Sequence, residues 1–282
     1  MYKILSKKSL NPTVTEMWIE APLVAKKAKA GQFIILRVDE EGERIPLTVA
    51  GTDQETGGVR IIFQIVGATT LKLNQKEAGE SIQDFAGPLG APTEIEGLKK
   101  VIVVGGGVGS AIALPVARAL KESGAEVVSV IGFRNKDLLI LEDEFNEISD
   151  RLIVCTDDGS YGLHGNVTVP IKELLEKESF DKIIAIGPLI MMKFVVATAK
   201  PFGVPVTVSM NPIMIDGTGM CGGCRLTLNE EDGPVVRFAC VDGPDFDGYK
   251  VDFDEAMSRG RIYMPFERHA YEEACNLFKK EA

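Results

Sequence analysis

The first third of the chain alternates short apolar runs with turn-forming residues. Up to about residue 96 the apolar runs, such as 32–38 and 59–67, are separated by Gly, Pro, Asp and Glu. Short strands bounded by such residues are typical of antiparallel sheets with tight connections. The pattern predicts a small antiparallel β-barrel or sandwich at the N-terminus.

From residue 98 the pattern changes to five continuous apolar runs. Segments with helical periodicity lie between them, at 111–123, 138–148 and 167–177. Strands that are apolar on both faces and alternate with helices form parallel sheets covered on both sides. Pro115 lies inside the first predicted helix, so we expect that helix to start late or to kink. This part predicts a five-stranded parallel sheet, which binds ligands at the carboxyl ends of its strands.

After residue 210 neither pattern persists. Residues 211–248 are rich in Gly, Asp and Pro and contain three of the five cysteines, which indicates a small core held by metal. The tail, 249–282, is expected to be helical, and an apolar stripe at helical spacing packs against the same chain or a partner. The stripe consists of Phe266, Ala270, Ala274, Leu277 and Phe278. The predicted domains are therefore 1–97, 98–210, 211–248 and 249–282.

The composition argues against several kinds of function. The 282 residues carry a formal net charge of −10 without clustered Lys and Arg, which argues against a nucleic-acid surface. The N-terminus has no apolar stretch long enough for a signal-peptide core, so we expect a cytoplasmic protein with reduced thiols. The longest uncharged run, 101–117, contains four glycines and a proline, so no membrane segment is predicted.

A glycine-rich turn follows the first predicted parallel strand. Gly106, Gly107 and Gly109 would let the backbone approach a pyrophosphate, at the start of a helix that offers free N–H groups. Glycines there could equally serve tight packing alone. The loops 156–165 and 185–195 would project from the same edge of the sheet, and this convergence favours a nucleotide site.

Three short motifs in the antiparallel part could contact a ligand. They are RIPLT at 44–48, FQIVGATT at 63–70 and GPLG at 87–90. Pro46 fixes the backbone so that the following N–H groups and the Thr48 hydroxyl can face a ligand, and the second motif could receive phosphate oxygens. Each motif alone is ordinary turn chemistry, but their order ahead of a nucleotide sheet favours a binding role.

The cysteines give the most specific signal. Asp216, Cys221 and Cys224 follow the spacing Asp-x4-Cys-x2-Cys, and Cys240 lies further on. The plant-type [2Fe–2S] spacing is C-x4-C-x2-C with a distant fourth Cys, so this is that loop with Asp as the first ligand. A carboxylate carries the same charge as a thiolate and can reach an iron. Cys155 has no adjoining His or Lys and is interpreted as a buried strand residue.

Structural zinc is the rival interpretation of the same cysteines. Cys221, Cys224 and Cys240 could supply three ligands, and Asp242, His269 or Cys275 a fourth. The second C-x2-C pair that is usual for such sites is missing, and Asp216 falls at the plant-type position. The pattern therefore favours iron–sulfur over zinc.

Taken in order, these motifs resemble the ferredoxin reductase-like flavoproteins over nearly the whole chain. With the cysteine loop, the chain is similar to the electron transfer subunits of dihydroorotate dehydrogenase and sulfide dehydrogenase. It also resembles the small subunits of bifurcating NADH-dependent reduced ferredoxin:NADP oxidoreductases, which place Asp at the first cluster position where the dihydroorotate relatives have Cys, and this shared Asp ranks them first. The resemblance implies a multi-domain β and α/β fold, with FAD on the barrel, nicotinamide nucleotide on the parallel sheet and a [2Fe–2S] cluster near the C-terminus.

The resemblance also assigns residues to each cofactor. The flavin candidates are Arg44, Pro46, Leu47, Thr48, Phe63, Gln64, Ile65, Gly67, Thr69 and Thr70. The nicotinamide candidates are Gly106, Gly107, Gly109, Asp157, Gly187, Pro188 and Met191. Arg134 ends the second parallel strand and could meet the 2′-phosphate of NADP(H), whereas the resemblance favours NAD(H). The cluster ligands are Asp216, Cys221, Cys224 and Cys240.

The implied function is that of an oxidoreductase subunit. Hydride is exchanged with NAD(H) at FAD, and single electrons pass through the cluster to a larger flavin or iron–sulfur subunit in a heterodimer. No catalytic side chain is expected, because hydride transfer to a flavin depends on positioning. Two other functions stay open: a zinc-stabilised flavin diaphorase acting alone, and a non-enzymatic nucleotide binder.

Overall fold

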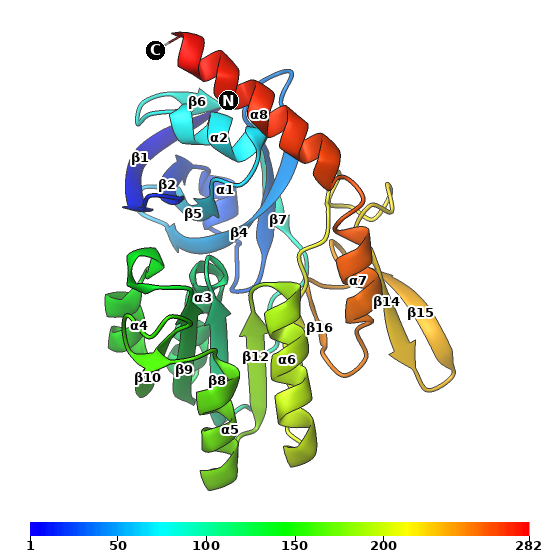
Figure 1. Cartoon of the computed structure of the whole chain (residues 1–282). Helices are drawn as coiled ribbons and strands as arrows, with labels where there is room; N and C mark the ends of the chain where they lie inside the picture. Colours follow the sequence, from blue (N-terminus) through cyan, green and yellow to red (C-terminus); the bar gives the residue numbers. More distant parts are fainter. Residues whose placement is uncertain (282) are drawn as a thin grey trace.

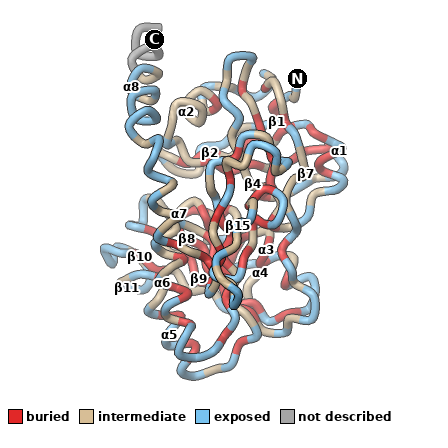
Figure 2. The backbone as a smooth tube through the Cα atoms, turned by 90° about the vertical axis from the view of Figure 1, so that its right-hand side faces the viewer, coloured by how far each residue is buried: buried red, intermediate tan, exposed pale blue. Residues whose placement is uncertain are grey.

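The computed structural model describes residues 1–281, with side chains described up to Cys275. Two seven-stranded sheets lie one above the other, and a two-stranded hairpin projects beside the second sheet (Figure 1). Buried residues gather inside the two sheets and along their junction, while the C-terminal helix is mostly exposed (Figure 2). The mixed β and α/β architecture predicted from the sequence is thus confirmed.

The N-terminal sheet has the order β6-β1-β2-β5-β4-β3-β7, and every pairing is antiparallel. Its edge strands β6 and β7 are separated in sequence only by Gln83, so the sheet curls round. No hydrogen-bonded pairing joins these edges within the described chain, so the predicted closed barrel is not found. The elements are β1 (Tyr2–Asn11), β2 (Val14–Glu20), α1 (Pro22–Ala25), β3 (Phe33–Arg37), β4 (Arg44–Asp53), β5 (Gly58–Gln64), α2 (Ala68–Gln75), β6 (Ser81–Ile82) and β7 (Asp84–Leu89).

The second sheet has the order β11-β10-β9-β8-β12-β13-β16, and only β16 is antiparallel to its neighbour. The chain runs outward from β8 to β10 and then returns to β12 on the other side of β8, so the order reverses between β8 and β12. The elements are β8 (Lys100–Gly106), α3 (Gly109–Glu122), β9 (Glu126–Phe133), η1 (Lys136–Leu138), α4 (Glu142–Ile148), β10 (Arg151–Thr156), β11 (Leu163–His164), α5 (Thr168–Lys177), β12 (Lys182–Ile186), α6 (Leu189–Ala199), η2 (Lys200–Phe202), β13 (Val206–Ser209) and β16 (Asp245–Asp247).

Helices cover both faces of this sheet, as its doubly apolar strands predict. Side chains of α3 and α4 pack with Val101 and Val103, whereas those of α5 and α6 pack with Ile102 and Val104. Neighbouring residues of one strand thus point to opposite faces. Helix α3 begins earlier than expected and continues through Pro115. The predicted helix at 138–148 is instead the short η1 followed by α4.

The C-terminal part contains β14 (Arg225–Glu230), β15 (Gly233–Phe238), α7 (Phe253–Arg259) and α8 (Met264–Glu281). Strand β16 belongs to the range 211–248 but pairs with β13, so this segment is joined to the parallel sheet. Helix α8 crosses beside α2 (Figure 1). Phe266 is 73% exposed and Ala270 is also exposed, so this part of the predicted stripe is not packed within the chain. Leu277 and Phe278 lie outside the residues whose side chains are described.

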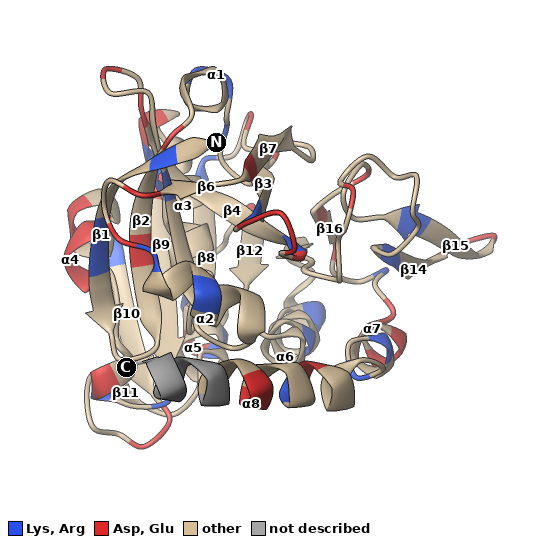
Figure 3. Cartoon of the chain, turned by 90° about the horizontal axis from the view of Figure 1, so that it is seen from above, with Lys and Arg blue, Asp and Glu red and all other residues tan. Residues whose placement is uncertain are grey.

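Charged residues of both signs are interspersed over the surface rather than segregated (Figure 3). Throughout the described residues, no helix combines the length and apolarity needed to cross a membrane.

An ion-pair network ties the N-terminal sheet to the second sheet. The Arg60 guanidinium on β5 donates to Glu16 on β2 at 2.9 Å and to both carboxylate oxygens of Glu144 on α4, at 2.8 and 2.7 Å. The side chains of Arg60 and Glu16 are only 12% and 13% exposed. The hydrogen bonds from Arg60 hold the pKa of Glu144 below its usual value.

Replacing Arg60 by alanine is expected to lower the free energy of unfolding by about 3 kcal/mol, because it leaves two carboxylates without their shared partner. Lys76→Ala is the matched control, since it breaks an exposed pair with Glu80 and should cost less than about 1 kcal/mol. Urea titrations of both variants provide the comparison. Equal losses would show that the Arg60 network does not stabilise the junction.

Candidate functional site

The glycine-rich turn after β8 meets the loop after β12 at the point where strand order reverses. Gly107 has φ +55 and donates its N–H to the Gly132 carbonyl at 2.8 Å. A Cβ on Gly109 would lie 2.5 Å from the Ile186 carbonyl oxygen, and one on Gly106 would lie 2.3 Å from the Met191 sulfur. The turn therefore requires Gly109 for its close packing against β12 and Gly107 for its positive φ, whereas a side chain at 106 would displace the flexible Met191.

This packing brings Gly106, Gly109, Gly187 and Met191 into contact at the carboxyl edge of the sheet, where α3 begins. Doubly wound sheets bind ligands at this edge, where the strand order reverses. A helix N-terminus suits a phosphate, although the Ser110 and Ala111 N–H groups of α3 already donate to the Gly107 and Val108 carbonyls at 3.1 and 3.0 Å. The predictions made for Gly106, Gly107, Gly109, Gly187 and Met191 thus converge on one place; Pro188, just before α6, lies within 3.2 Å of the Cβ position built on Gly106.

Arg134 and Asp157 lie at the same edge, beyond β9 and β10. Arg134 is exposed, and its carbonyl accepts the Asp158 N–H at 3.2 Å, while the Asp157 N–H donates to the Phe133 carbonyl at 3.0 Å. Hydrogen bonds from Ser160 lower the pKa of Asp158. Asp157 and Asp158 therefore lie next to Arg134. The interpretation of Arg134 from the sequence did not consider their negative charge.

The alternation of side chains along β4 separates the flavin candidates into two groups. The β3–β4 register pairs Phe33 with Thr48 and Ile35 with Pro46. Phe33 and Ile35 belong to the core that faces the second sheet, so Pro46 and Thr48 share that outer face. Leu47 packs against the inner core instead. Leu47 can therefore meet a ligand on the outer face only through its backbone.

The second flavin motif is also partly structural. Phe63 is 1% exposed and packs inside the N-terminal sheet, so the prediction that it holds a cofactor applies to its backbone at most. The Thr70 hydroxyl accepts the Val66 and Gly67 N–H groups, both at 3.0 Å. It thereby caps the start of α2, where the first N–H groups are available to an anion.

The remaining flavin candidates differ in their exposure and in whether their side chains already have hydrogen-bond partners. Thr69 donates its hydroxyl to the Glu43 carboxylate at 3.0 Å, so a ligand would have to compete for it. Gln64, Ile65 and Gly67 are partly buried, and Arg44 is exposed.

The four cluster candidates form two pairs. The Cys224 and Cys240 sulfurs are 3.2 Å apart and nearly inaccessible, at 1% and 2% exposure. Two thiolates bound to one tetrahedral metal at a bond length of ~2.3 Å lie ~3.8 Å apart. The two sulfurs would therefore have to move only slightly further apart to bind an iron. Burial, then the hydrogen bond with Cys224, raises the pKa of Cys240 to about 12. Metal binding must therefore release protons from this pair.

Asp216 and Cys221 form the second pair, nearer the surface. The Asp216 carboxylate accepts the Thr218 N–H and the Cys221 N–H, each at 2.8 Å. The hydrogen bond from Thr218, followed by those from Cys221, lowers the pKa of Asp216 and keeps it charged. Each carboxylate oxygen keeps a lone pair, so the same side chain can brace the loop and still bind a metal.

The arrangement in pairs suits two irons, because each iron of a [2Fe–2S] cluster takes two protein ligands. A zinc ion instead needs four donors around one point. Asp242 accepts the Phe238 N–H at 2.7 Å, and His269 pairs with Glu273 on α8. The donor set therefore fits a two-iron cluster better than zinc.

Cys155 is fully buried in β10, as predicted. Burial, with a smaller contribution from Asp157, raises the pKa of its thiol to about 11. A thiol that stays protonated is a poor nucleophile.

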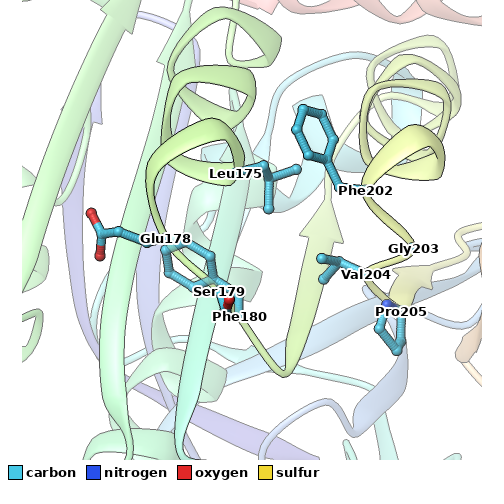
Figure 4. Close-up of a pocket in the computed structure, with 8 residues that line it drawn as sticks. All are labelled: Leu175, Glu178, Ser179, Phe180, Phe202, Gly203, Val204 and Pro205. Carbon is cyan, nitrogen blue, oxygen red and sulfur yellow. The ribbon is translucent and has the colours of Figure 1, made fainter.

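A hollow of about 250 Å³ lies at the amino ends of β12 and β13, opposite the candidate site (Figure 4). Its one charged residue, Glu178, is paired with Arg151 and Lys100, which lower its pKa to about 2. This hollow has no link to the predicted nucleotide or metal residues.

Asp245 is a buried carboxylate that the sequence did not single out. It accepts the Thr93 hydroxyl at 2.6 Å, and thereby ties β16 to the segment that joins the two sheets. Its other oxygen is buried without a hydrogen-bond partner among the described residues. Burial raises the pKa of Asp245 above its usual value of 3.8.

Because the folded-state pKa of Asp245 is raised, the stability that its proton provides is complete below about pH 3.8 and is lost as the pH rises through the folded value. Asp245→Asn cannot ionise but keeps an oxygen for Thr93. As the pH rises above 4, the free energy of unfolding of Asp245→Asn is therefore expected to increase relative to that of the wild type. Denaturant titrations across this range check the difference; a difference independent of pH would contradict the burial cost.

Comparisons with known proteins agree with this geometry. Residues 211–252 match the family profile described as the iron–sulfur cluster binding domain of dihydroorotate dehydrogenase B. The dihydroorotate dehydrogenase B (NAD(+)) electron transfer subunit homolog of Thermotoga maritima is 50% identical over 96% of this chain and 94% of its own length. The corresponding electron transfer subunit of Streptococcus pneumoniae is 34% identical over 86% of this chain and 94% of its own length.

Solved structures give the same picture. A chain of the NADH-dependent reduced ferredoxin-NADP oxidoreductase, a structure described for flavin-based electron bifurcation, superimposes with a TM-score of 0.90 at 48% identity, over 97% of both chains. A ferredoxin NADP+ reductase of Neisseria gonorrhoeae shares the fold alone, with a TM-score of 0.57 at 18% identity over 72% of this chain and 90% of its own. The chain belongs to the family of dihydroorotate dehydrogenase B electron transfer subunits and their homologues.

Proposed function

We propose that the chain is the electron transfer subunit of an oxidoreductase that exchanges hydride with NAD(H) at FAD and passes single electrons through a [2Fe–2S] cluster to a larger partner subunit. The donor set of two pairs, Asp216 with Cys221 and Cys224 with Cys240, carries this proposal. Bound FAD would accept an electron pair as hydride and release it singly, and the cluster would carry one electron at a time.

The chain's own residues would bind and position these groups. Pro46 and Thr48 lie on the outer face of the N-terminal sheet, which would bind the flavin in place of a closed barrel. The first turn of α2 offers N–H groups for the flavin phosphates, and that of α3 for the nucleotide phosphates. The domains 1–97, 98–210 and 211–248 would thus hold flavin, nucleotide and cluster, and 249–282 would cover α2.

NAD(H) is the proposed nucleotide. Asp157 and Asp158 lie beside Arg134, and their negative charge would oppose the 2′-phosphate of NADP(H). The relatives named as NAD(+) enzymes point the same way. A comparison of the Michaelis constants for NADH and NADPH, with an artificial acceptor, decides between them; a clear preference for NADPH would overturn this choice.

The partner would be a larger flavin or iron–sulfur subunit. In the structural relative, the whole enzyme is the NADH-dependent reduced ferredoxin-NADP oxidoreductase, and the bifurcating complex is the partner proposed first. A dihydroorotate or sulfide dehydrogenase is the alternative. Purification of the protein with its partner under anaerobic conditions, followed by assays with NADPH plus ferredoxin and with dihydroorotate, separates these possibilities.

Cofactor content tests the proposal as a whole. The protein purified without oxygen should contain FAD and about two irons and two sulfides per chain. One zinc per chain without iron would favour the stand-alone flavin diaphorase. Absence of flavin would favour a nucleotide binder without enzymatic activity.

A further inference from the structure

The loop that follows Asp216 packs directly on the N-terminal sheet at Gly217. This residue is buried and has φ +75. A Cβ at its position would lie 2.6 Å from Cδ1 of Leu89 on β7 and 2.9 Å from Cδ1 of Ile35 on β3. A side chain at this position would force the ends of Leu89 and Ile35 to shift, and the positive φ would add backbone strain.

The contact lies next to the candidate flavin surface. Ile35 pairs with Pro46, and Leu89 pairs with Phe33, which in turn pairs with Thr48. Neighbouring strands are ~4.8 Å apart, so Gly217 touches the strands that lie one and two positions from β4. Asp216, a proposed iron ligand, is its immediate neighbour in the chain.

Two other ties hold the C-terminal segment to the same region. The Ala91 N–H donates to the Gly243 carbonyl at 2.7 Å, and Thr93 donates to Asp245 at 2.6 Å. Both lie beyond Cys240, so they fasten the far end of the segment, and Gly217 adds a contact with the N-terminal sheet inside the 216–224 loop. A side chain at 217 would therefore shift this loop while the segment stayed attached.

We propose that Gly217 is the positioning residue that holds the cluster loop against β3 and β7, and so keeps residues 216–224 at a short distance from Pro46 and Thr48. This inference rests on the proposed function, because the short distance matters only if flavin and cluster exchange electrons. Gly217 itself touches neither group in this proposal; it acts through the packing of the loop.

Gly217→Ala tests the proposal, and Gly222→Ala is its matched control. Gly222 lies in the same loop with φ +66, but the nearest atom to its Cβ position is in ordinary contact, Cε1 of Phe238 at 3.7 Å. Both substitutions impose backbone strain, and only the first collides with the N-terminal sheet. In the double variant Leu89→Ala/Gly217→Ala, the shortened side chain at 89 leaves space for the methyl group at 217. Leu89→Ala alone is the reference for this double variant.

Two measurements on the cofactor-loaded protein provide the first test. In rapid-mixing experiments, Gly217→Ala should leave the rate of flavin reduction by NADH unchanged and slow the following reduction of the cluster severalfold. Gly222→Ala should also leave flavin reduction unchanged, and it should slow cluster reduction less than Gly217→Ala does. The Leu89→Ala/Gly217→Ala protein should recover much of the rate of cluster reduction relative to Gly217→Ala.

A second test does not depend on electron transfer. In the cofactor-free protein, Gly217→Ala should lower the melting temperature by about 2–4 °C more than Gly222→Ala and speed amide hydrogen exchange in β3 and β7. In the Leu89→Ala background, Gly217→Ala should lower the melting temperature by less than it does in the wild-type background. Equal behaviour of the two glycine variants in both tests would overturn the proposal. A wild-type protein without flavin or cluster would overturn the proposed function instead, and the second test would still judge the contact.

Discussion

Replacing Asp216 by alanine is expected to remove most of the iron, from about two atoms per chain to below one, while the flavin stays bound. The substitution deletes a proposed iron ligand and also the carboxylate that accepts the Thr218 and Cys221 N–H groups. NADH should still reduce the flavin, because the nucleotide turn lies in a different part of the chain. Iron and sulfide analysis, with visible spectra, measures the result.

Asp216→Cys separates the two roles of this carboxylate. A thiolate keeps the charge and can bind iron, but it does not reproduce the two loop hydrogen bonds of Asp216. We expect Asp216→Cys to keep its iron and to change the electron paramagnetic resonance spectrum of the reduced cluster, because one iron then has a different ligand atom. A cluster that survives in Asp216→Ala with an unchanged spectrum would show that Asp216 only braces the loop.

Gly109→Ala is expected to weaken NADH binding and so to slow the reduction of the flavin. Its new Cβ would lie 2.5 Å from the Ile186 carbonyl, a backbone atom of β12 that cannot move like the end of a side chain. Overpacking of this kind costs about 1–3 kcal/mol of folding stability, and moving the turn away from β12 to relieve it should weaken NADH binding. Binding titrations and the rate of flavin reduction by NADH measure this loss, while the iron content should stay as in the wild type.

The control for this variant is Gly124→Ala, at the far end of the same helix. Gly124 has φ +90 and no atom within 4 Å of its Cβ position, so the change imposes strain without a collision. It should lower stability slightly and leave NADH binding unchanged. If both variants bind NADH as the wild type does, the turn at Gly106–Gly109 serves packing alone.

Periodicity was sufficient to predict the two sheets, because burial on one or both faces dictates which positions are apolar. It could not show that β16 joins the parallel sheet, since a three-residue strand in a Gly- and Asp-rich segment has no period of its own. It also could not show that α3 continues through Pro115. The sequence predicted the antiparallel sheet but not whether its edge strands pair into a closed barrel, because that pairing depends on tertiary curvature, which the sequence does not encode locally.

At the candidate site, the spacing of residues in the sequence predicted which motifs come together, but it did not predict which way the side chains point. The glycine turn meets the loop after β12, Cys224 lies beside Cys240, and Asp216 accepts the Cys221 N–H. Phe63 and Leu47 turn into the inner core, although strict alternation along β4 would have shown this for Leu47 once its register with β3 was known. The contacts of Gly217 and Asp245 join residues more than 100 positions apart, and no local pattern announces them.

The most direct measurement is electron paramagnetic resonance of the purified protein after anaerobic addition of NADH. The account predicts that NADH reduces the flavin and that the signal of a reduced [2Fe–2S] cluster then appears, with an altered spectrum in Asp216→Cys. A flavin that is reduced without any cluster signal, in protein shown to contain its iron and sulfide, would contradict the relay between the two sites.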